Sequence, residues 1–326
     1  MADSPEPGTT ILAIVGPTAV GKTRVAGVVA PAVGAEIISV DSMQVYRGMD
    51  RGTAKPDAET RASVPYHMLD VIDPSENFSA ALYKQMADRA IADVASRGKK
   101  PMMVGGSGLY FRAVVDDLDF ANVGGDELYR AEVEEELEDM ETGELYELLR
   151  EMDPGAASQM SAGNRRRILK AIQVAREGDR LMSERQHSWS DYESPYELWT
   201  AGLEMERALL YRLIDARVDW MMEAGLEEEV RRLQEAGLKR GSTAGEAIGY
   251  AQMLDYLDGE LTLEEVVSDI KQRTRNYAKR QLTWFRRDPR VKWFVVQADV
   301  DDPMEDVESS LDETAGMVLE YFSEYL

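Results

Sequence analysis

The chain has 326 residues, of which 44% are hydrophobic, and its formal net charge is −24. This length is enough to bury a sizeable core in one large domain or two modest ones. The absence of cysteine excludes disulfides, a cysteine nucleophile and thiolate metal sites, and two histidines make a multi-histidine metal centre unexpected. The sequence has no apolar run long enough to cross a bilayer, and residues 1–10 do not resemble a signal peptide. We therefore expect a cytoplasmic protein without membrane contact.

A phosphate-binding loop is predicted near the start of the chain. Residues 16–23 read Gly-Pro-Thr-Ala-Val-Gly-Lys-Thr and fit G-x-x-x-x-G-K-[ST], between a strand-like run at 11–15 and a helix-like segment at 24–30. In such a loop, backbone N–H groups and the helix N-terminus converge on an oligophosphate. We expect Lys22 to add a charge and the Thr23 hydroxyl to bind Mg²⁺. A plain strand-to-helix turn is the alternative. The candidate ligand-binding residues are Gly16, Thr18, Ala19, Val20, Gly21, Lys22 and Thr23.

The next segments alternate between strand-like and helix-like patterns. Residues 36–40 and 101–104 are short apolar runs typical of buried strands, and residues 79–97 have the apolar spacing of a helix. The polar, glycine-containing stretch at 41–56 is predicted to be a loop at the carboxyl edge of the sheet, where open α/β folds bind ligands. The alternation predicts an α/β fold with a P-loop NTPase-like parallel sheet flanked by helices.

The pattern changes at residue 116, where strand-like runs give way to long charged stretches with leucine at helical spacing. We expect an inserted all-helical subdomain at 116–194, which divides the catalytic core into residues 1–115 and 195–326. The second part of the core is predicted to contain two strands, at 198–203 and 291–296, and four helices, at 207–236, 244–257, 263–287 and 301–326.

The charges are distributed unevenly along the chain. The overall excess of acid argues against a nucleic-acid partner, because counterion release favours basic surfaces. Residues 271–292 are the exception, with nine basic residues and Asp288 as the single acid. The acidic excess is interpreted as a solvated surface, of a kind that would suit a salt-rich cytoplasm.

Six segments, taken together and in this order, resemble the tRNA dimethylallyltransferase (tRNA isopentenyltransferase) family. The resemblance spans residues 11–294, and the segments are 16–23, 41–50, 52–56, 104–110, 248–250 and 274–286. It implies transfer of a dimethylallyl group from its diphosphate to N6 of the adenine just 3′ of the anticodon. It also implies that the P-loop holds the diphosphate of this donor, and not ATP, with Mg²⁺ as cofactor.

The resemblance assigns catalytic roles to Asp41, Ser107 and Arg217. Asp41 follows a predicted strand and could accept the proton that the adenine amine loses as it attacks. An N-cap or a magnesium ligand of a kinase is the alternative role for this residue. Ser107 stands where the family usually has threonine, and a turn serine is its alternative. Arg217 matches an arginine that reaches the diphosphate; without the resemblance it reads as a solvated helix charge.

The resemblance also implies contacts with the tRNA anticodon stem-loop, from the loop after residue 40, the insert and the basic helix. Arg166 and Lys170 depart from the family pattern, which leaves their individual contacts open. A monomer is expected. The candidate tRNA-binding residues are Asp41, Ser42, Met43, Gln44, Ser107, Arg130, Arg166, Arg167, Lys170, Gly249, Tyr250, Lys279, Arg280, Gln281, Trp284 and Arg286.

Three other functions compete with this interpretation. An enzyme that prenylates free adenine nucleotides would have no task for the insert or the basic helix. A small-molecule kinase would use the P-loop and Asp41 equally well. The third alternative is a catalytically silent RNA-binding or nucleotide-switch protein, against which an intact P-loop together with Asp41 and Arg217 argues. An assay that mixes the purified protein with prenyl diphosphate, ATP and an anticodon stem-loop would distinguish these possibilities.

Overall fold

The computed structural model describes most of the chain as two compact units. The larger unit comprises residues 1–117 and 194–326, and the smaller comprises residues 118–193. The described residues are 5–118, 127–177, 181–183, 192–297 and 303–324.

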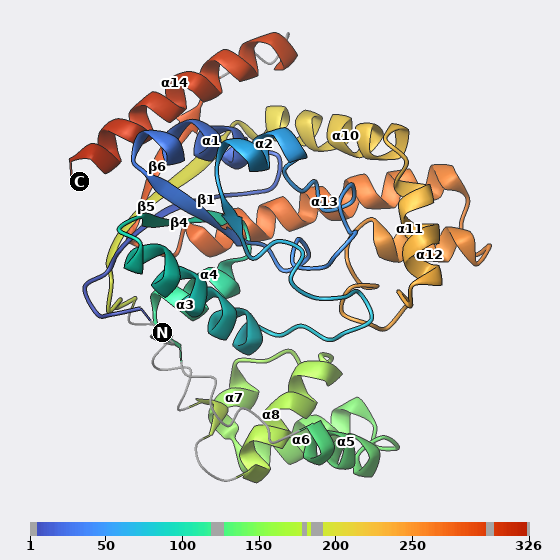
Figure 1. The fold of residues 1–326 in the computed structure, drawn as a ribbon. Helices are drawn as coiled ribbons and strands as arrows, with labels where there is room; N and C mark the ends of the chain where they lie inside the picture. Colours follow the sequence, from blue (N-terminus) through green and yellow to red (C-terminus); the bar gives the residue numbers. More distant parts are fainter. Residues whose placement is uncertain (1–4, 119–126, 178–180, 184–191, 298–302, 325–326) are drawn as a thin grey trace. The chain divides into compact units, whose positions relative to one another are not determined.

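The larger unit is built on one parallel sheet of six strands in the order β3-β2-β4-β1-β5-β6 (Figure 1). Every neighbouring pair in it is parallel. The strand order confirms the predicted α/β fold, and it brings the carboxyl ends of β1, β2 and β4 side by side at one edge. The strands are β1 (Thr10–Val15), β2 (Ala35–Val40), β3 (Tyr66–His67), β4 (Lys100–Gly105), β5 (Glu197–Met205) and β6 (Val291–Val296).

The central strand β1 is buried on both faces. Ile11, Ala13 and Val15 pack in one hydrophobic core, and Leu12 and Ile14 pack in a second core. Because successive side chains of a strand point to opposite faces, a strand between two cores must be apolar throughout. This explains why β1 appears in the sequence as a continuous apolar run.

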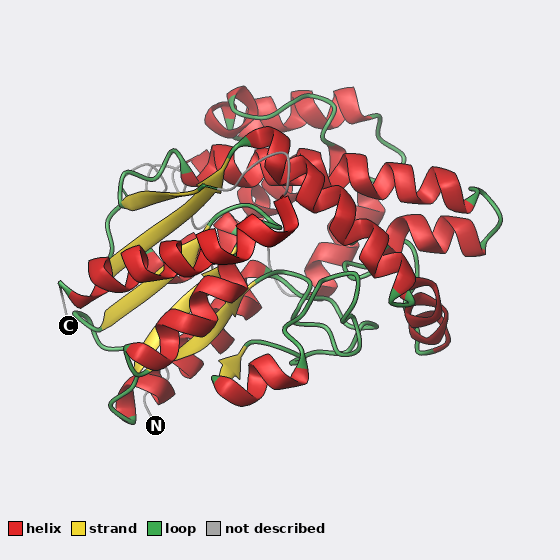
Figure 2. Cartoon of the chain, turned by 90° about the horizontal axis from the view of Figure 1, so that it is seen from above, coloured by secondary structure: helices red, strands yellow, loops and turns green. Residues whose placement is uncertain are grey.

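Helices cover both faces of the sheet, as Figure 2 shows from above. One core contains side chains from α1 (Lys22–Ala32) and α14 (Pro303–Ser323). The other contains side chains from α3 (Ala80–Ser96), α4 (Gly108–Val115), α11 (Leu226–Glu235) and α12 (Tyr250–Leu257). Two helices, α10 (Arg207–Glu223) and α13 (Leu263–Phe285), contribute side chains to both cores. The short helix α2 (Ala58–Ser63) precedes β3.

Two predicted helices have different limits in the structure. The helix predicted at 207–236 is divided into α10 and α11 at Gly225, whose φ of 94° is left-handed and cannot continue a helix. The helix predicted at 244–257 begins only at Tyr250, because residues 244–249 form turns and end at Gly249 with a φ of 95°. Both differences arise from a backbone conformation that apolar spacing does not reveal.

The regular structure of the smaller unit, in its described residues, consists of helices joined by turns. Its own hydrophobic core includes Val133, Leu145, Leu149 and Ile168. Asp153 is fully buried, and its carboxylate accepts a hydrogen bond from the backbone N–H of Ala156, which caps a short helix. The helices are α5 (Glu127–Glu136), α6 (Thr142–Met152), α7 (Pro154–Ser158) and α8 (Arg165–Glu177).

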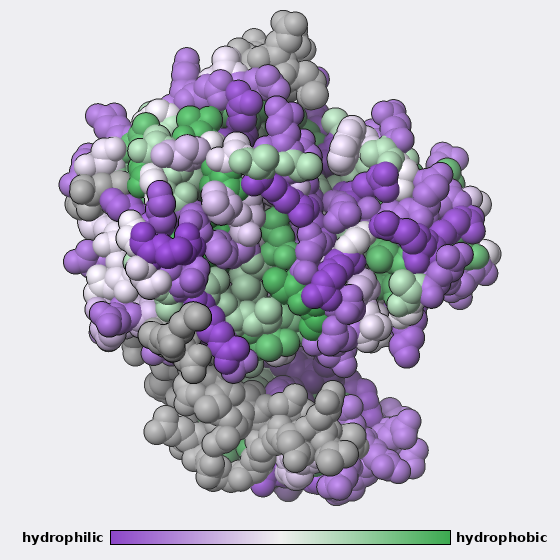
Figure 3. Space-filling view, in the orientation of Figure 1, coloured by the Kyte–Doolittle hydropathy of each residue, from purple (hydrophilic) through white to green (hydrophobic). Residues whose placement is uncertain are grey.

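The surface reflects the charged composition. Figure 3 shows that hydrophilic residues cover most of the visible face of the larger unit, while hydrophobic residues gather in a band near its middle. Among the described helices, none has the length and apolar character needed to cross a membrane.

Candidate active site

The P-loop lies between β1 and α1, at the carboxyl edge of the sheet. Gly16 has a φ of 146°, and a Cβ there would lie 2.5 Å from the carbonyl oxygen of Leu203, so only glycine fits. The Lys22 ammonium donates to the carbonyl oxygens of Gly16 (3.0 Å) and Pro17 (2.6 Å). The Val20 side chain is buried in the core, and Val20 lines neither of the two cavities described below. The loop therefore has the closed backbone curve that binds phosphate groups.

Two cavities meet beside this loop. The first, which we call the P-loop cavity, measures about 350 Å³ and has Lys22 and Thr23 in its wall. The second, the apolar cavity, measures about 290 Å³ and is lined by hydrophobic side chains of α10, α13 and the segment before α12. The apolar residues of the second cavity are Met43, Ile214, Val218, Met221, Ala247, Ile248 and Ile270. The residues that line both cavities are Thr18, Asp41, Thr53, Arg217 and Tyr277.

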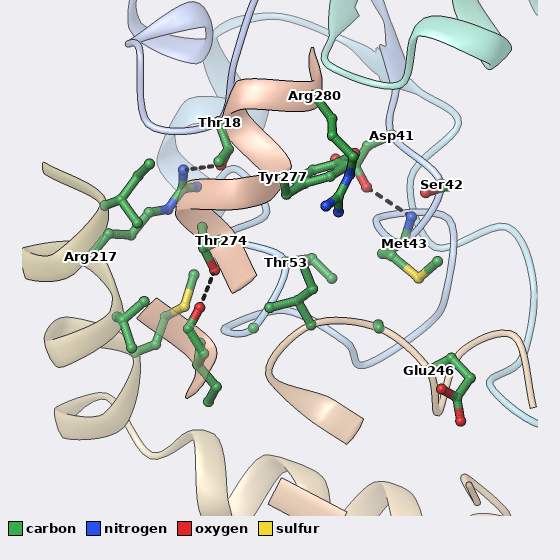
Figure 4. A pocket seen from close by; sticks show the side chains of 17 residues that line it. Thr18, Asp41, Ser42, Met43, Thr53, Arg217, Glu246, Thr274, Tyr277 and Arg280 are labelled. Carbon is green, nitrogen blue, oxygen red and sulfur yellow. Dashed lines mark hydrogen bonds between the residues drawn. The ribbon is translucent and has the colours of Figure 1, made fainter. Parts of the chain in front are cut away.

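Asp41 lies at the end of β2, where the two cavities meet (Figure 4). Its Oδ1 accepts hydrogen bonds from the backbone N–H groups of Met43 (2.8 Å) and Gln44 (3.1 Å). Burial raises the pKa of the Asp41 carboxyl, and these two N–H groups, with Lys22 and Arg217, oppose the shift. The carboxylate is thus fixed in direction and more basic than an ordinary aspartate, which suits a proton acceptor.

Two cations stand beside Asp41. Arg217, from α10, donates a hydrogen bond to the Thr18 hydroxyl at 3.2 Å, and Figure 4 shows it pointing toward the P-loop. Burial lowers the pKa of Arg217, and burial together with Arg217 lowers the pKa of Lys22 to about 7. Two half-buried cations that repel one another form a site that a bound polyanion would stabilise.

Tyr277 lines both cavities, and Ser107 contacts the residue that follows Asp41. The Ser107 hydroxyl accepts a hydrogen bond from the backbone N–H of Ser42 at 3.2 Å. Burial raises the pKa of Tyr277 to about 12, so its phenol is neutral. Tyr277 was absent from the candidate site residues, although it lies inside the 274–286 segment that carried the resemblance.

Gln281 is a correction to the predicted tRNA contacts. Its side chain is 5% exposed and faces the P-loop. The amide oxygen accepts from the backbone N–H of Thr18 (2.8 Å), and the amide nitrogen donates to the carbonyl oxygen of Gly106 (3.0 Å). We therefore assign Gln281 to holding α13 against the P-loop, because its hydrogen-bonding groups are already used.

Tyr250 and Gln44 are likewise held inside the protein. Tyr250 is fully buried, and its hydroxyl donates to Glu229 at 2.6 Å. Gly249, at the N-cap of α12, donates its backbone N–H to the side-chain oxygen of Gln252. The amide of Gln44 bonds with Ser39 and with the backbone of residues 53–54. Tyr250 has no exposed surface that could contact tRNA, so its role is to support the residues that line the cavities.

The basic helix α13 places several predicted residues at the surface. Lys279, Arg280 and Trp284 are exposed, and the Arg280 guanidinium lies 5.7 Å from the Tyr277 ring centre. Arg280 also lines the apolar cavity. Arg286 is exposed and forms an ion pair with Glu204 at 2.7 Å. This helix therefore joins the cavity to a positively charged surface.

The predicted residues of the smaller unit lie on α5 and α8. Arg165 donates to backbone carbonyls at 137–140 and so has a structural task. Its neighbours Arg166 and Arg167 are exposed, and Lys170 is half-buried. Arg130 belongs to α5, but its side chain lies outside the described part of the structure. Arg166 and Arg167 are the basic side chains of α8 that face solvent most fully.

The described residues contain no group of three or more carboxylate or imidazole side chains that could hold a metal by itself. Thr23 and Asp41 both line the P-loop cavity. Mg²⁺ keeps several waters and is commonly bound by one or two protein oxygens together with substrate phosphates. The Thr23 hydroxyl, with diphosphate oxygens and waters, fits such an ion.

Comparisons with known proteins agree on one family. Residues 44–288 match the family described as IPP transferase. A tRNA dimethylallyltransferase of Carboxydothermus hydrogenoformans is 44% identical over 87% of this chain and 91% of its own length. The crystal structure of the full-length tRNA isopentenylpyrophosphate transferase from Bacillus halodurans is 40% identical, covers 97% of this chain and 98% of its own, and has a TM-score of 0.66.

A eukaryotic dimethylallyltransferase, solved in crystallographic snapshots acting on tRNA, shares the fold. It has a TM-score of 0.78 at 24% identity and covers 97% of this chain and 80% of its own. The family match covers residues 44–288, and the relative from Carboxydothermus covers 87% of the chain. The chain therefore belongs to the tRNA dimethylallyltransferase family.

Proposed function

We propose that the chain transfers a dimethylallyl group from dimethylallyl diphosphate to N6 of the adenine just 3′ of the anticodon in tRNA, with release of diphosphate. The observation that carries the proposal is the pair of cavities that share Asp41 and Arg217. One cavity has the P-loop and its lysine, and the other is apolar. A prenyl diphosphate has the same two halves, a polyanionic head and a short apolar tail.

The P-loop cavity would stabilise the leaving group. As the bond between C1 of the prenyl group and the diphosphate oxygen breaks, its electron pair stays on that oxygen. Backbone N–H groups of the P-loop, Lys22 and Arg217 surround the place where this charge develops. Thr23 would hold Mg²⁺ together with the diphosphate oxygens, and the ion would neutralise further charge on the diphosphate.

Asp41 would take the proton that the acceptor loses. The lone pair of N6 forms the new bond to C1, and the N6 proton moves to the Asp41 carboxylate. The exocyclic amine of adenine is a weak nucleophile, so removing its proton during attack lowers the barrier. The raised pKa of Asp41 and its hydrogen bonds to Met43 and Gln44 support this role.

The junction of the two cavities at Asp41 would receive the extruded adenine, and the basic helix would bind the surrounding RNA. An adenine stacked within the stem-loop must leave its stack before N6 can reach Asp41. Ser42 and Met43 line the apolar cavity and would contact the extruded base. Lys279, Arg280 and Trp284 offer charge and an aromatic plane to the RNA backbone and neighbouring bases.

The smaller unit would bind the same RNA. Arg166 and Arg167, with Arg130 and Lys170, would contact the anticodon stem, mainly through phosphates. Arg286 would join these contacts after leaving Glu204. A cytoplasmic location and a monomeric state complete the proposal.

The direct test offers dimethylallyl diphosphate, Mg²⁺ and a synthetic anticodon stem-loop to the purified protein and follows the RNA by mass spectrometry. The expected product carries one dimethylallyl group on the adenine 3′ of the anticodon. A stem-loop with inosine at that position lacks the exocyclic amine and should stay unmodified. Transfer of phosphate from ATP, or no modification of the adenine stem-loop, would contradict the proposal.

A further inference from the structure

Glu229 is a buried carboxylate on α11 that does not line either cavity. Its side chain is 0% exposed. Its oxygens accept hydrogen bonds from the backbone N–H of Asp50 (3.1 Å), the backbone N–H of Arg51 (3.0 Å) and the hydroxyl of Tyr250 (2.6 Å). The Arg51 guanidinium lies 3.7 Å away. A buried charge is tolerated when donors surround it, and most of these donors belong to one loop.

This loop, residues 48–54, forms part of the wall of the apolar cavity through Gly52 and Thr53. Gly52 packs under the Tyr250 ring so closely that a Cβ would lie 2.5 Å from it. The Thr53 hydroxyl donates to the carbonyl oxygen of Met49 at 2.6 Å, which closes the loop on itself. Glu229 and Tyr250 thus hold the loop from the side opposite the cavity.

The same loop continues the contacts to Asp41. The side-chain amide of Gln44 donates to the carbonyl oxygen of Thr53 at 3.1 Å and accepts from the Ser39 hydroxyl at 2.9 Å. The backbone N–H of Gln44 donates to Asp41 Oδ1 at 3.1 Å. An unbroken series of hydrogen bonds and chain connections therefore runs from Glu229, through loop 48–54 and Gln44, to Asp41.

We propose that Glu229 and Tyr250 are positioning residues of the transfer reaction, which act by fixing loop 48–54 and, through Gln44, the direction of the Asp41 carboxylate. Well-packed apolar residues could stabilise the same region at least as well as a buried charge. What the carboxylate adds is a fixed geometry for two successive backbone N–H groups. The inference rests on the proposed function, because it takes Asp41 as the group that receives the proton.

The first experiment measures single-turnover rates of Glu229→Gln and Tyr250→Phe with saturating donor and stem-loop. Because a misplacement of about 1 Å can cost about 100-fold, we expect Glu229→Gln to lower the rate by about 10- to 100-fold and Tyr250→Phe to lower it less. The donor is kept saturating because Thr53 of this loop lines both cavities, so a change in donor affinity does not enter the measured rate. Glu235→Gln, an exposed change on the same helix, is the matched control.

The second experiment repeats Glu229→Gln in an Asp41→Asn background, at a temperature where thermal melting shows every variant folded. If Glu229 acts through Asp41, the substitution should cost little once Asp41 is lost. Equal rate losses in both backgrounds, or no loss in the wild-type background, would overturn the inference. A wild-type rate for Asp41→Asn alone would instead remove Asp41 from the proposed function, so the two failures are distinguishable.

Discussion

Binding of the donor should take up a proton at Lys22 and weaken as the pH rises. In the free protein, burial and Arg217 lower the pKa of Lys22 to about 7, and its ammonium contacts only backbone carbonyls of the P-loop. A diphosphate in the P-loop cavity would hold the charged form. Above pH 7 the free protein has lost this proton and the complex retains it, so each binding event must restore it.

The size of the effect follows from the pKa of about 7. If Lys22 stays charged in the complex, the dissociation constant should rise about 75-fold between pH 7.5 and 9.5, or about 2.6 kcal/mol. Phosphate groups with a pKa near 6 are already ionised across this range, so the donor itself contributes little. The change in donor affinity with pH therefore measures the protonation of Lys22.

Isothermal titration calorimetry with dimethylallyl diphosphate, without RNA, measures both quantities. Titrations at pH 8.5 in two buffers of different ionisation enthalpy should show uptake of about one proton per donor. Lys22→Arg, which stays charged at every pH used, should bind with an affinity that changes little with pH. An equally flat profile for the wild-type protein, with no proton uptake, would refute the reasoning.

Three further substitutions test separate parts of the site. Arg217→Ala should weaken stabilisation of the departing diphosphate, lowering kcat/KM by a factor equivalent to about 2–4 kcal/mol in steady-state kinetics. Gln281→Leu leaves two backbone groups without partners and should lower the free energy of unfolding by about 1–3 kcal/mol in urea titrations. Lys279→Glu with Arg280→Glu should weaken stem-loop binding by about tenfold or more, with a smaller dependence of affinity on salt concentration.

Each of these three predictions would be contradicted by a specific result. A wild-type kcat/KM for the Arg217 variant would place the arginine outside the reaction. Unchanged stability of the Gln281 variant would mean that solvent replaces the amide without cost. Unaltered stem-loop affinity in the doubly charge-reversed protein would show that the basic helix is only a solvated surface. Donor affinity, measured in parallel, separates loss of the RNA surface from loss of the whole site.

The sheet was predictable because its signals are local. Residues 11–15 and 101–104 are apolar throughout, as strands between two cores must be, and the loop at 41–56 is polar and rich in turn residues. The P-loop pattern is also contiguous. Parallel strands that share a sheet end at the same edge, so the order of elements alone predicts that the P-loop and the loop at 41–56 lie close together.

The other parts of the site depend on contacts that local patterns do not contain. Gln281 and Tyr250 fall within segments that resemble the family, yet both are buried and support loops distant in sequence. Tyr277 was missed because its place between the two cavities depends on how α13 crosses the sheet edge. Exposed basic residues and buried polar ones look alike in a sequence, and only packing separates them.

The most direct test of the account is the single-turnover rate of Asp41→Asn with saturating dimethylallyl diphosphate and stem-loop. The account predicts a rate about 10² to 10⁴ times lower than wild type, because the N6 proton has lost its acceptor. Donor affinity should be largely preserved, since the P-loop remains intact. A near-wild-type rate under the same conditions would contradict the claim that Asp41 receives the proton.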